Sequence, residues 1–150
     1  MKKLFIGCMA ALAAVVGLSG CSEKKVSYSG PDYLMFSDTI YSYPVQENGE
    51  TFKVPVSATV KSDRDRTFAV EIIDSKSNAI EGKHYRLLNN NVIIKAGEMA
   101  GYVEVQGIYE NIGVSDSLGF ALRLIIPEEY KWDNYGTDAN VVLYKVCPFD

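Results

Sequence analysis

The chain has 150 residues, of which 47% are hydrophobic and 23% are charged, and its formal net charge is -4. This is the composition of a folded globular protein and not of a disordered one. The excess of acidic residues, with no run rich in lysine or arginine, excludes the cationic surface on which nucleic-acid binding depends. We therefore expect partners other than nucleic acid.

The N-terminal segment has the pattern of an export signal. Two lysines at positions 2–3 precede an apolar run over 4–16, which is shorter than the roughly 18 residues of a membrane-spanning helix. The run ends in Leu18-Ser19-Gly20-Cys21, which resembles a bacterial lipobox. That resemblance implies cleavage before Cys21 and lipid attachment to its thiol and new amino group. The alternative is a secreted protein that is cleaved elsewhere, with Cys21 an ordinary thiol.

These features divide the chain into three parts. We expect a lipoprotein signal peptide over 1–20, the lipidated cysteine and a flexible tether over 21–32, and a single domain over 33–150. A flexible tether of about ten residues spans only ~18 Å, so the domain would lie close to its membrane. The predicted location is the cell envelope, anchored by lipid in the outer membrane. The sequence leaves open whether the domain faces the periplasm or the exterior.

The cysteines fit this division. Cys8 is in the signal peptide and Cys21 carries lipid, so Cys147 alone remains and no intramolecular disulfide can form. We expect Cys147 to be a small buried hydrophobic residue. The alternative is an intermolecular disulfide or a metal thiolate.

From residue 33 onward the hydrophobic pattern repeats every two residues, and turn-forming clusters recur about every ten. This pattern is typical of an all-β fold. In the clearest strand, 51–60, Phe52, Val54 and Val56 share the face predicted to be core. Pro55 cannot donate a backbone hydrogen bond, so we expect this strand to have an edge there. The seven predicted strands are 39–45, 51–60, 67–73, 91–95, 101–109, 118–126 and 140–146.

Seven short strands without crossover helices predict a Greek-key, immunoglobulin-like β-sandwich. The turn between the second and third strands alternates acids and bases, namely Asp63, Arg64, Asp65 and Arg66. We expect a salt-bridged hairpin there, not a catalytic carboxylate pair.

Four stretches resemble the Calx-beta type of β-sandwich. They are 79–85, which contains a Gly-Lys-His-Tyr turn, 92–98, which ends in Gly-Glu, 101–105, and the Phe-x-Leu-x-Leu pattern of 120–124. The region 33–130 also resembles a domain of uncharacterised lipoproteins from Bacteroidetes, in which Asp-Arg before a strand and Glu-Gly-x-His-Tyr after it recur. Both resemblances imply a sandwich fold, and neither implies an activity. Gly82 and Gly97 occupy turns that need a positive φ.

In the calcium-binding members of the Calx-beta type, carboxylates before the tyrosine and after the Gly-Glu strand hold the ion. The matching positions here are His84 and the sequence Tyr109-Glu110-Asn111, which remove most of the oxygen ligands that Ca²⁺ requires. We expect no calcium site there, and Glu47, Glu81 and Glu110 are the only remaining candidates. We predict no metal and no cofactor.

The residues for catalysis are sparse. His84 is the single histidine, which excludes multi-histidine metal sites, and Ser115 lacks the Gly-x-Ser-x-Gly elbow of a hydrolase. We expect His84 to hydrogen-bond a loop backbone. The prediction is a protein that is not an enzyme, with an envelope hydrolase using carboxylates as the alternative.

One loop concentrates groups suited to binding. Tyr130-Lys131-Trp132-Asp133-Asn134-Tyr135 combines aromatic rings with fixed polar groups, which can hold a sugar face. The candidate ligand-binding residues are Tyr130, Trp132 and Tyr135. The alternative is that Trp132 caps the open end of the sandwich and the tyrosines cover its core.

A second candidate surface is the tyrosine-rich region 28–43, whose strand could pair with a partner if its edge is open. The leading hypothesis is a non-catalytic, lipid-anchored binding module for a glycan or a protein. The alternative is a structural spacer or an assembly subunit of a surface complex.

Overall fold

A computed structural model describes residues 28–132 and 136–149. The predicted signal peptide, Cys21 and Tyr135 lie outside these residues. The described part is built from nine strands and three short 3-10 helices, and it holds no helix long and apolar enough to cross a bilayer.

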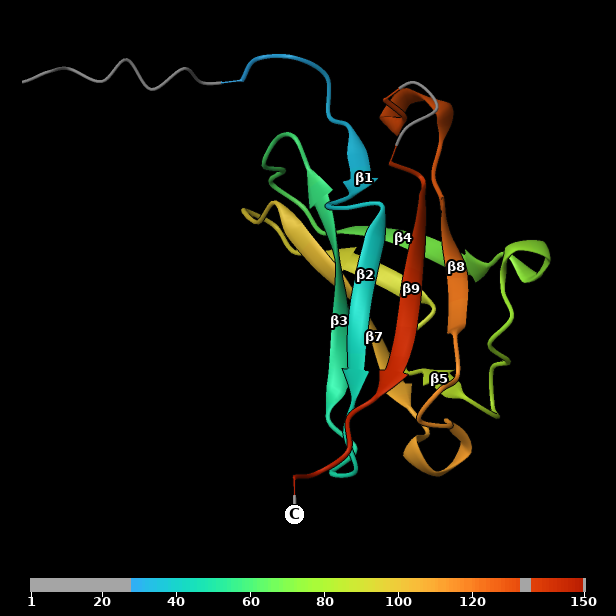
Figure 1. Cartoon of the computed structure of the whole chain (residues 1–150). Helices are drawn as coiled ribbons and strands as arrows, with labels where there is room; N and C mark the ends of the chain where they lie inside the picture. The colour runs from blue at the N-terminus through green and yellow to red at the C-terminus, as the bar shows by residue number, and fades with distance from the viewer. Residues whose placement is uncertain (1–27, 133–135, 150) are drawn as a thin grey trace, which may run out of the picture.

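The strands form two curled sheets that face each other (Figure 1). The four-stranded sheet has the order β1-β3-β7-β5 and the five-stranded sheet has the order β2-β9-β8-β4-β6. The strands are β1 (Leu34–Phe36), β2 (Ile40–Val45), β3 (Thr51–Ala58), β4 (Arg66–Ile72), β5 (Tyr85–Leu87), β6 (Asn91–Ile94), β7 (Ala100–Gly107), β8 (Leu118–Ile125) and β9 (Asp138–Lys145).

The core lies between the sheets, because alternate residues of each strand point inward. Val54, Val103, Leu122 and Leu143 are fully buried representatives of strands from both sheets. The inward residues of β3 are those predicted from its alternation, with Phe52 at the partly buried end. Burial of each such side chain contributes about 1.5 to 3 kcal/mol to the stability of the sandwich.

The all-β sandwich prediction is confirmed, with nine strands in place of seven. All seven predicted strands are present, with ends that differ by at most two residues. The two additional strands, β1 and β5, have three residues each and are too short to produce a recognisable alternation. All pairings between strands are antiparallel except that of β2 with β9, because the chain changes sheets between β1 and β2.

β3 has an open edge at Pro55, as expected, because its neighbour β1 ends there. β3 is an interior strand, but β1 pairs with it only as far as the match of Phe36 with Val56. The Pro55 carbonyl accepts a hydrogen bond from the Ser37 N–H at 3.1 Å, so the proline nitrogen points to the side on which β1 ends. The lack of an N–H at Pro55 therefore removes no hydrogen bond between β1 and β3.

Two smaller expectations are confirmed. His84 is buried, and its Nδ1 accepts a hydrogen bond from the Ile80 N–H at 2.9 Å, which makes it part of the turn. Gly82 and Gly97 have φ values of 84° and 78°.

The prediction of a salt-bridged hairpin at 63–66 is wrong for half of its members. Asp63 and Arg64 pair with each other at 3.8 Å, both exposed. Asp65 instead binds Lys95, and Arg66 turns inward between the sheets. Arg66 is the first residue of β4, and the alternation of that strand directs it to the inner face.

The prediction that Cys147 is buried is also wrong, since Cys147 is exposed. β9 ends at Lys145, and the Val146 N–H makes the last bond to β2, through the Val45 carbonyl. Beyond that bond the chain leaves the sheet, so no inward face remains on which a side chain could be buried.

Candidate functional site

The predicted binding loop, 130–135, follows β8 and begins at the last residue of the short helix η3 (Glu128–Tyr130). Its turn is closed by hydrogen bonds from the Tyr130 N–H to the Pro127 carbonyl and from the Lys131 N–H to the Glu128 carbonyl. Tyr130 is partly buried and packs against the core, with its ring edge-to-face on Phe68 at a centroid distance of 5.4 Å. Tyr130 therefore fastens the loop to the sandwich instead of presenting its ring to solvent.

Trp132 has the opposite environment. Its side chain is 57% exposed, and its ring stacks on Tyr33 with a centroid distance of 5.9 Å and an interplanar angle of 22°. An indole supported on one side by a second ring offers a flat, apolar surface to a ligand. We name Tyr33 and Trp132 together the aromatic platform.

The loop is attached to β1 at Gly136, close to Tyr33. The Gly136 carbonyl accepts a hydrogen bond from the Phe36 N–H of β1 at 2.7 Å. A Cβ at Gly136 would lie 2.5 Å from the Cβ of Met35, and its φ is 81°, so only glycine fits this close approach. β1 therefore pins the end of the loop beside the strand that Tyr33 precedes.

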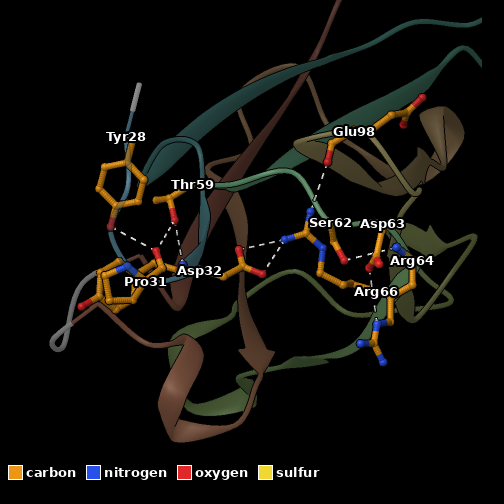
Figure 2. A network of polar contacts seen from close by, with 10 residues as sticks. Tyr28, Pro31, Asp32, Thr59, Ser62, Asp63, Arg64, Arg66 and Glu98 are labelled. Carbon is orange, nitrogen blue, oxygen red and sulfur yellow. Dashed lines mark hydrogen bonds and ion pairs between the residues drawn. The ribbon is translucent and has the colours of Figure 1, made fainter. Parts of the chain in front are cut away.

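Tyr33 is itself fixed by its backbone. Its N–H donates to the Thr59 Oγ1 at 2.8 Å, and its carbonyl accepts from the Thr59 N–H at 3.0 Å. The Thr59 hydroxyl donates in turn to the Pro31 carbonyl at 2.8 Å. Figure 2 shows that this same carbonyl also accepts a bond from the Tyr28 hydroxyl, at 3.0 Å. The backbone that carries the Tyr33 ring is thus fixed by hydrogen bonds to Thr59.

A buried ion pair lies next to this support (Figure 2). The Arg66 Nη1 donates to both carboxylate oxygens of Asp32, at 2.8 and 2.6 Å, and its Nη2 donates to the Glu98 carbonyl at 3.1 Å. Arg66 is only 7% exposed, and its Nε has no partner among the described residues. The pair joins β4 of one sheet to the chain entering β1 of the other. Removal of Asp32 would leave a buried charge uncompensated, which typically costs about 3 to 5 kcal/mol.

The structure describes two of the three residues predicted to bind ligand, and their environments differ. Trp132 is exposed, Tyr130 is directed to the core, and Tyr135 lies outside the described residues. Sequence reasoning did not assign Tyr33 to this site, because only the tertiary contact brings it to Trp132. Of the tyrosine-rich region, Tyr41 and Tyr43 pack on Phe52 and belong to the core. The strands β1 and β2 are each at the end of their sheet, so the predicted pairing with a partner strand stays a prediction.

The calcium candidates do not converge. Glu47 and Glu110 line one hollow of about 200 Å³ together with Arg86, and Glu81 lines a separate hollow of about 460 Å³ with Asp74. Within 28–132 and 136–149, no group of three or more His, Cys, Asp or Glu side chains could hold a metal ion. Asp74 and Glu81 are both exposed, which is not the desolvated setting that a catalytic acid needs.

A further hollow of about 500 Å³ lies against β8 and β9 and is rich in serine and asparagine. Two of its polar side chains are used by the fold. The Asn78 amide bonds the Ser117 carbonyl and the Gly119 N–H, and the Ser77 hydroxyl bonds the Ile73 carbonyl and the Ala121 N–H. The aromatic platform is therefore the better candidate for binding.

No protein-family model and no curated protein matches the sequence. Solved structures are similar in fold. The apo form of the Calx CBD1 domain has a TM-score of 0.58 at 16% identity, over 79% of this chain and 100% of that one. A candidate carbohydrate-binding protein from Bacteroides ovatus ATCC 8483 has a TM-score of 0.57 at 12% identity, over 75% of this chain and 37% of that one.

A third similar structure is Bacteroides thetaiotamicron EndoBT-3987 with Man5GlcNAc product. Its TM-score is 0.52 at 10% identity, over 75% of this chain and 31% of that one. The chain thus spans about a third of the length of both Bacteroides proteins. At these identities the likeness establishes the fold, which is a Calx-beta-like β-sandwich.

Proposed function

We propose that this protein is a non-catalytic, lipid-anchored glycan-binding module of the cell envelope. The observation that carries the proposal is the aromatic platform, in which the exposed Trp132 ring stacks on Tyr33, whose backbone is hydrogen-bonded to Thr59. An exposed ring face of this kind suits the apolar face of a sugar ring. The likeness to a candidate carbohydrate-binding protein and to a structure with a bound glycan product supports the choice of a glycan.

The anchor is the second part of the proposal. The lipobox-like sequence ending in Cys21 supports a lipid anchor in the outer membrane, and mass spectrometry of the protein from its membrane fraction tests it. A diacylglyceryl modification and an acylated amino group on Cys21 are expected. An unmodified Cys21 in the mature protein would overturn this part.

Binding can be measured through Trp132 itself, because it is the single tryptophan of the chain. All described strands lie within 34–145, so a protein spanning 22–150 retains the whole sandwich. We expect saturable changes in its fluorescence with one or more oligosaccharides of a mannose-, glucose- and galactose-containing panel.

Two variants locate the site. Tyr33→Ala keeps the reporter and is expected to weaken binding. Tyr144→Ala removes a ring that is 45% exposed on the outward face of β9 and is expected to have no effect. Circular dichroism checks that both variants fold. The absence of any response at millimolar saccharide would sink the proposal and favour a protein partner.

The exposure of Cys147 favours one second candidate, an assembly subunit joined to neighbours by an intermolecular disulfide. A dimer on non-reducing gels from the native envelope that disappears in Cys147→Ser would support it. A monomer at every protein concentration would count against it.

A further inference from the structure

The aromatic platform lies at the end of the sandwich where the chain enters. In Figure 1, β1 and the η3 loop are at the same end of the molecule, and the C-terminus is at the opposite end. The Phe36–Gly136 hydrogen bond and the Tyr33–Trp132 stack show independently that the chain entering β1 and the loop are neighbours.

The entering chain is fastened to this end over several residues. Asp32 is held by the buried Arg66, Pro31 by Thr59, and Tyr28 folds back on Pro31. Seven positions separate Cys21 from Tyr28, which is the first residue that the structure describes. Seven residues reach at most about 25 Å when fully extended, and about 15 Å on average as a flexible chain.

The opposite end of the sandwich is much farther from the anchor. The strands β3 and β7 have eight residues each, which corresponds to a length of roughly 26 Å. The turn after β2, with Glu47, therefore lies a full strand length beyond the platform. A lipid on Cys21 would hold the platform, and not the far end, within reach of the headgroups.

The platform also limits the affinity. It is an exposed ring face and not an enclosed pocket, so it excludes little water from the ligand. Such a contact is expected to give a dissociation constant in the millimolar range for a free saccharide. A ligand confined to the same surface by a short link has an effective concentration that is itself millimolar.

These observations point to the source of the glycan. We propose that the aromatic platform binds glycans carried by the same membrane as the Cys21 lipid, so that its ligand is a glycolipid headgroup and not a free saccharide. The inference rests on the proposed function and adds the class of ligand. The short link to the lipid keeps the platform near the headgroups, and this confinement compensates for the weak contact.

The test compares one saccharide in two forms. The lipidated protein is placed in phosphatidylcholine vesicles, either with a dipalmitoyl neoglycolipid bearing the oligosaccharide that binds best in the panel or with that oligosaccharide free. We expect half-saturation of the Trp132 signal at a total saccharide concentration on the order of 10²-fold lower for the neoglycolipid.

Two controls isolate the tether. The unlipidated Cys21→Ser protein, added to the same vesicles, is expected to lose most of this gain. A Gly/Ser insertion that doubles the number of residues between Cys21 and Tyr28 is expected to reduce the gain by about threefold, because effective concentration falls with linker length. Neither change touches the platform, so binding of the free oligosaccharide should be unaltered.

The outcomes are distinguishable. Equal half-saturation for both forms, with free saccharide still bound, would overturn this inference and leave the proposed function standing. Shielding of Trp132 from iodide in vesicles that lack the neoglycolipid would overturn it in favour of contact with the lipid surface itself. A failure of every saccharide in the panel would instead remove the proposed function.

Discussion

Two stacked aromatic pairs in this sandwich have opposite environments. Tyr85 and Phe120 lie fully buried between the sheets, with a centroid distance of 3.9 Å and an angle of 11°. Tyr33 and Trp132 stack more loosely at the tether end, and Trp132 is 57% exposed. The comparison teaches that burial, and not stacking, decides the role of such a pair. The buried pair stabilises the fold, whereas the exposed pair leaves a ring face free for a ligand.

The largest expected effect is in the buried pair. Phe120→Ala removes a fully buried ring and leaves a cavity, so the free energy of unfolding should fall by about 3 to 5 kcal/mol. Urea unfolding followed by circular dichroism measures it. A loss below about 1 kcal/mol would show that the sheets close around the gap and would weaken the comparison.

The pH dependence is the next expected effect. Burial first, and then the charges of Glu81 and Asp74, raise the pKa of Tyr85 above the ordinary value of 10.0. As the pH rises past about 10, the unfolded chain loses this proton before the folded protein does. The stability contributed by Tyr85 is complete below pH 10 and then falls by about 1.4 kcal/mol per pH unit until the folded pKa is reached. Unfolding measured between about pH 8 and 11.5 checks this, because that range begins well below the ordinary tyrosine pKa and extends above it.

Tyr85→Phe is the matched control for that slope. Burial also raises the pKa of Tyr43, so the variant should reduce the alkaline loss of stability without abolishing it. An unchanged slope in Tyr85→Phe would contradict the assignment to Tyr85.

The same variant has a smaller effect at neutral pH. The Tyr85 hydroxyl is buried and has no hydrogen-bond partner among the described residues. Its removal should leave stability unchanged or raise it by about 1 kcal/mol, since a buried unpaired polar group is costly. A loss above about 1 kcal/mol would indicate that a bound water satisfies this hydroxyl.

The smallest effect on stability is expected at the exposed pair. Trp132→Ala should change the free energy of unfolding by less than about 1 kcal/mol, because most of the indole is already in water. Glycan capture, followed by calorimetry because the fluorescent reporter is lost, should nevertheless disappear. Large destabilisation without a change in binding would reverse the roles of the two pairs.

Much of the fold was predictable from the sequence because alternation is a local signal. All seven strands with a clear period of two were found, and His84 was correctly assigned to its turn. The strands β1 and β5 were not found, because three residues carry no period. The candidate site was predicted in part, since Trp132 was identified and its partner Tyr33 was not.

The sequence alone therefore determined which residues alternate into the core, where the chain turns, and hence the all-β class. Only the tertiary structure decided that Arg66 turns inward to Asp32, that Cys147 leaves the sheet, and that Tyr33 supports Trp132. The physical reason is the distance along the chain over which each feature is determined. Side-chain alternation follows from the geometry of a single strand, whereas these three outcomes depend on which strands pair and where the pairing ends.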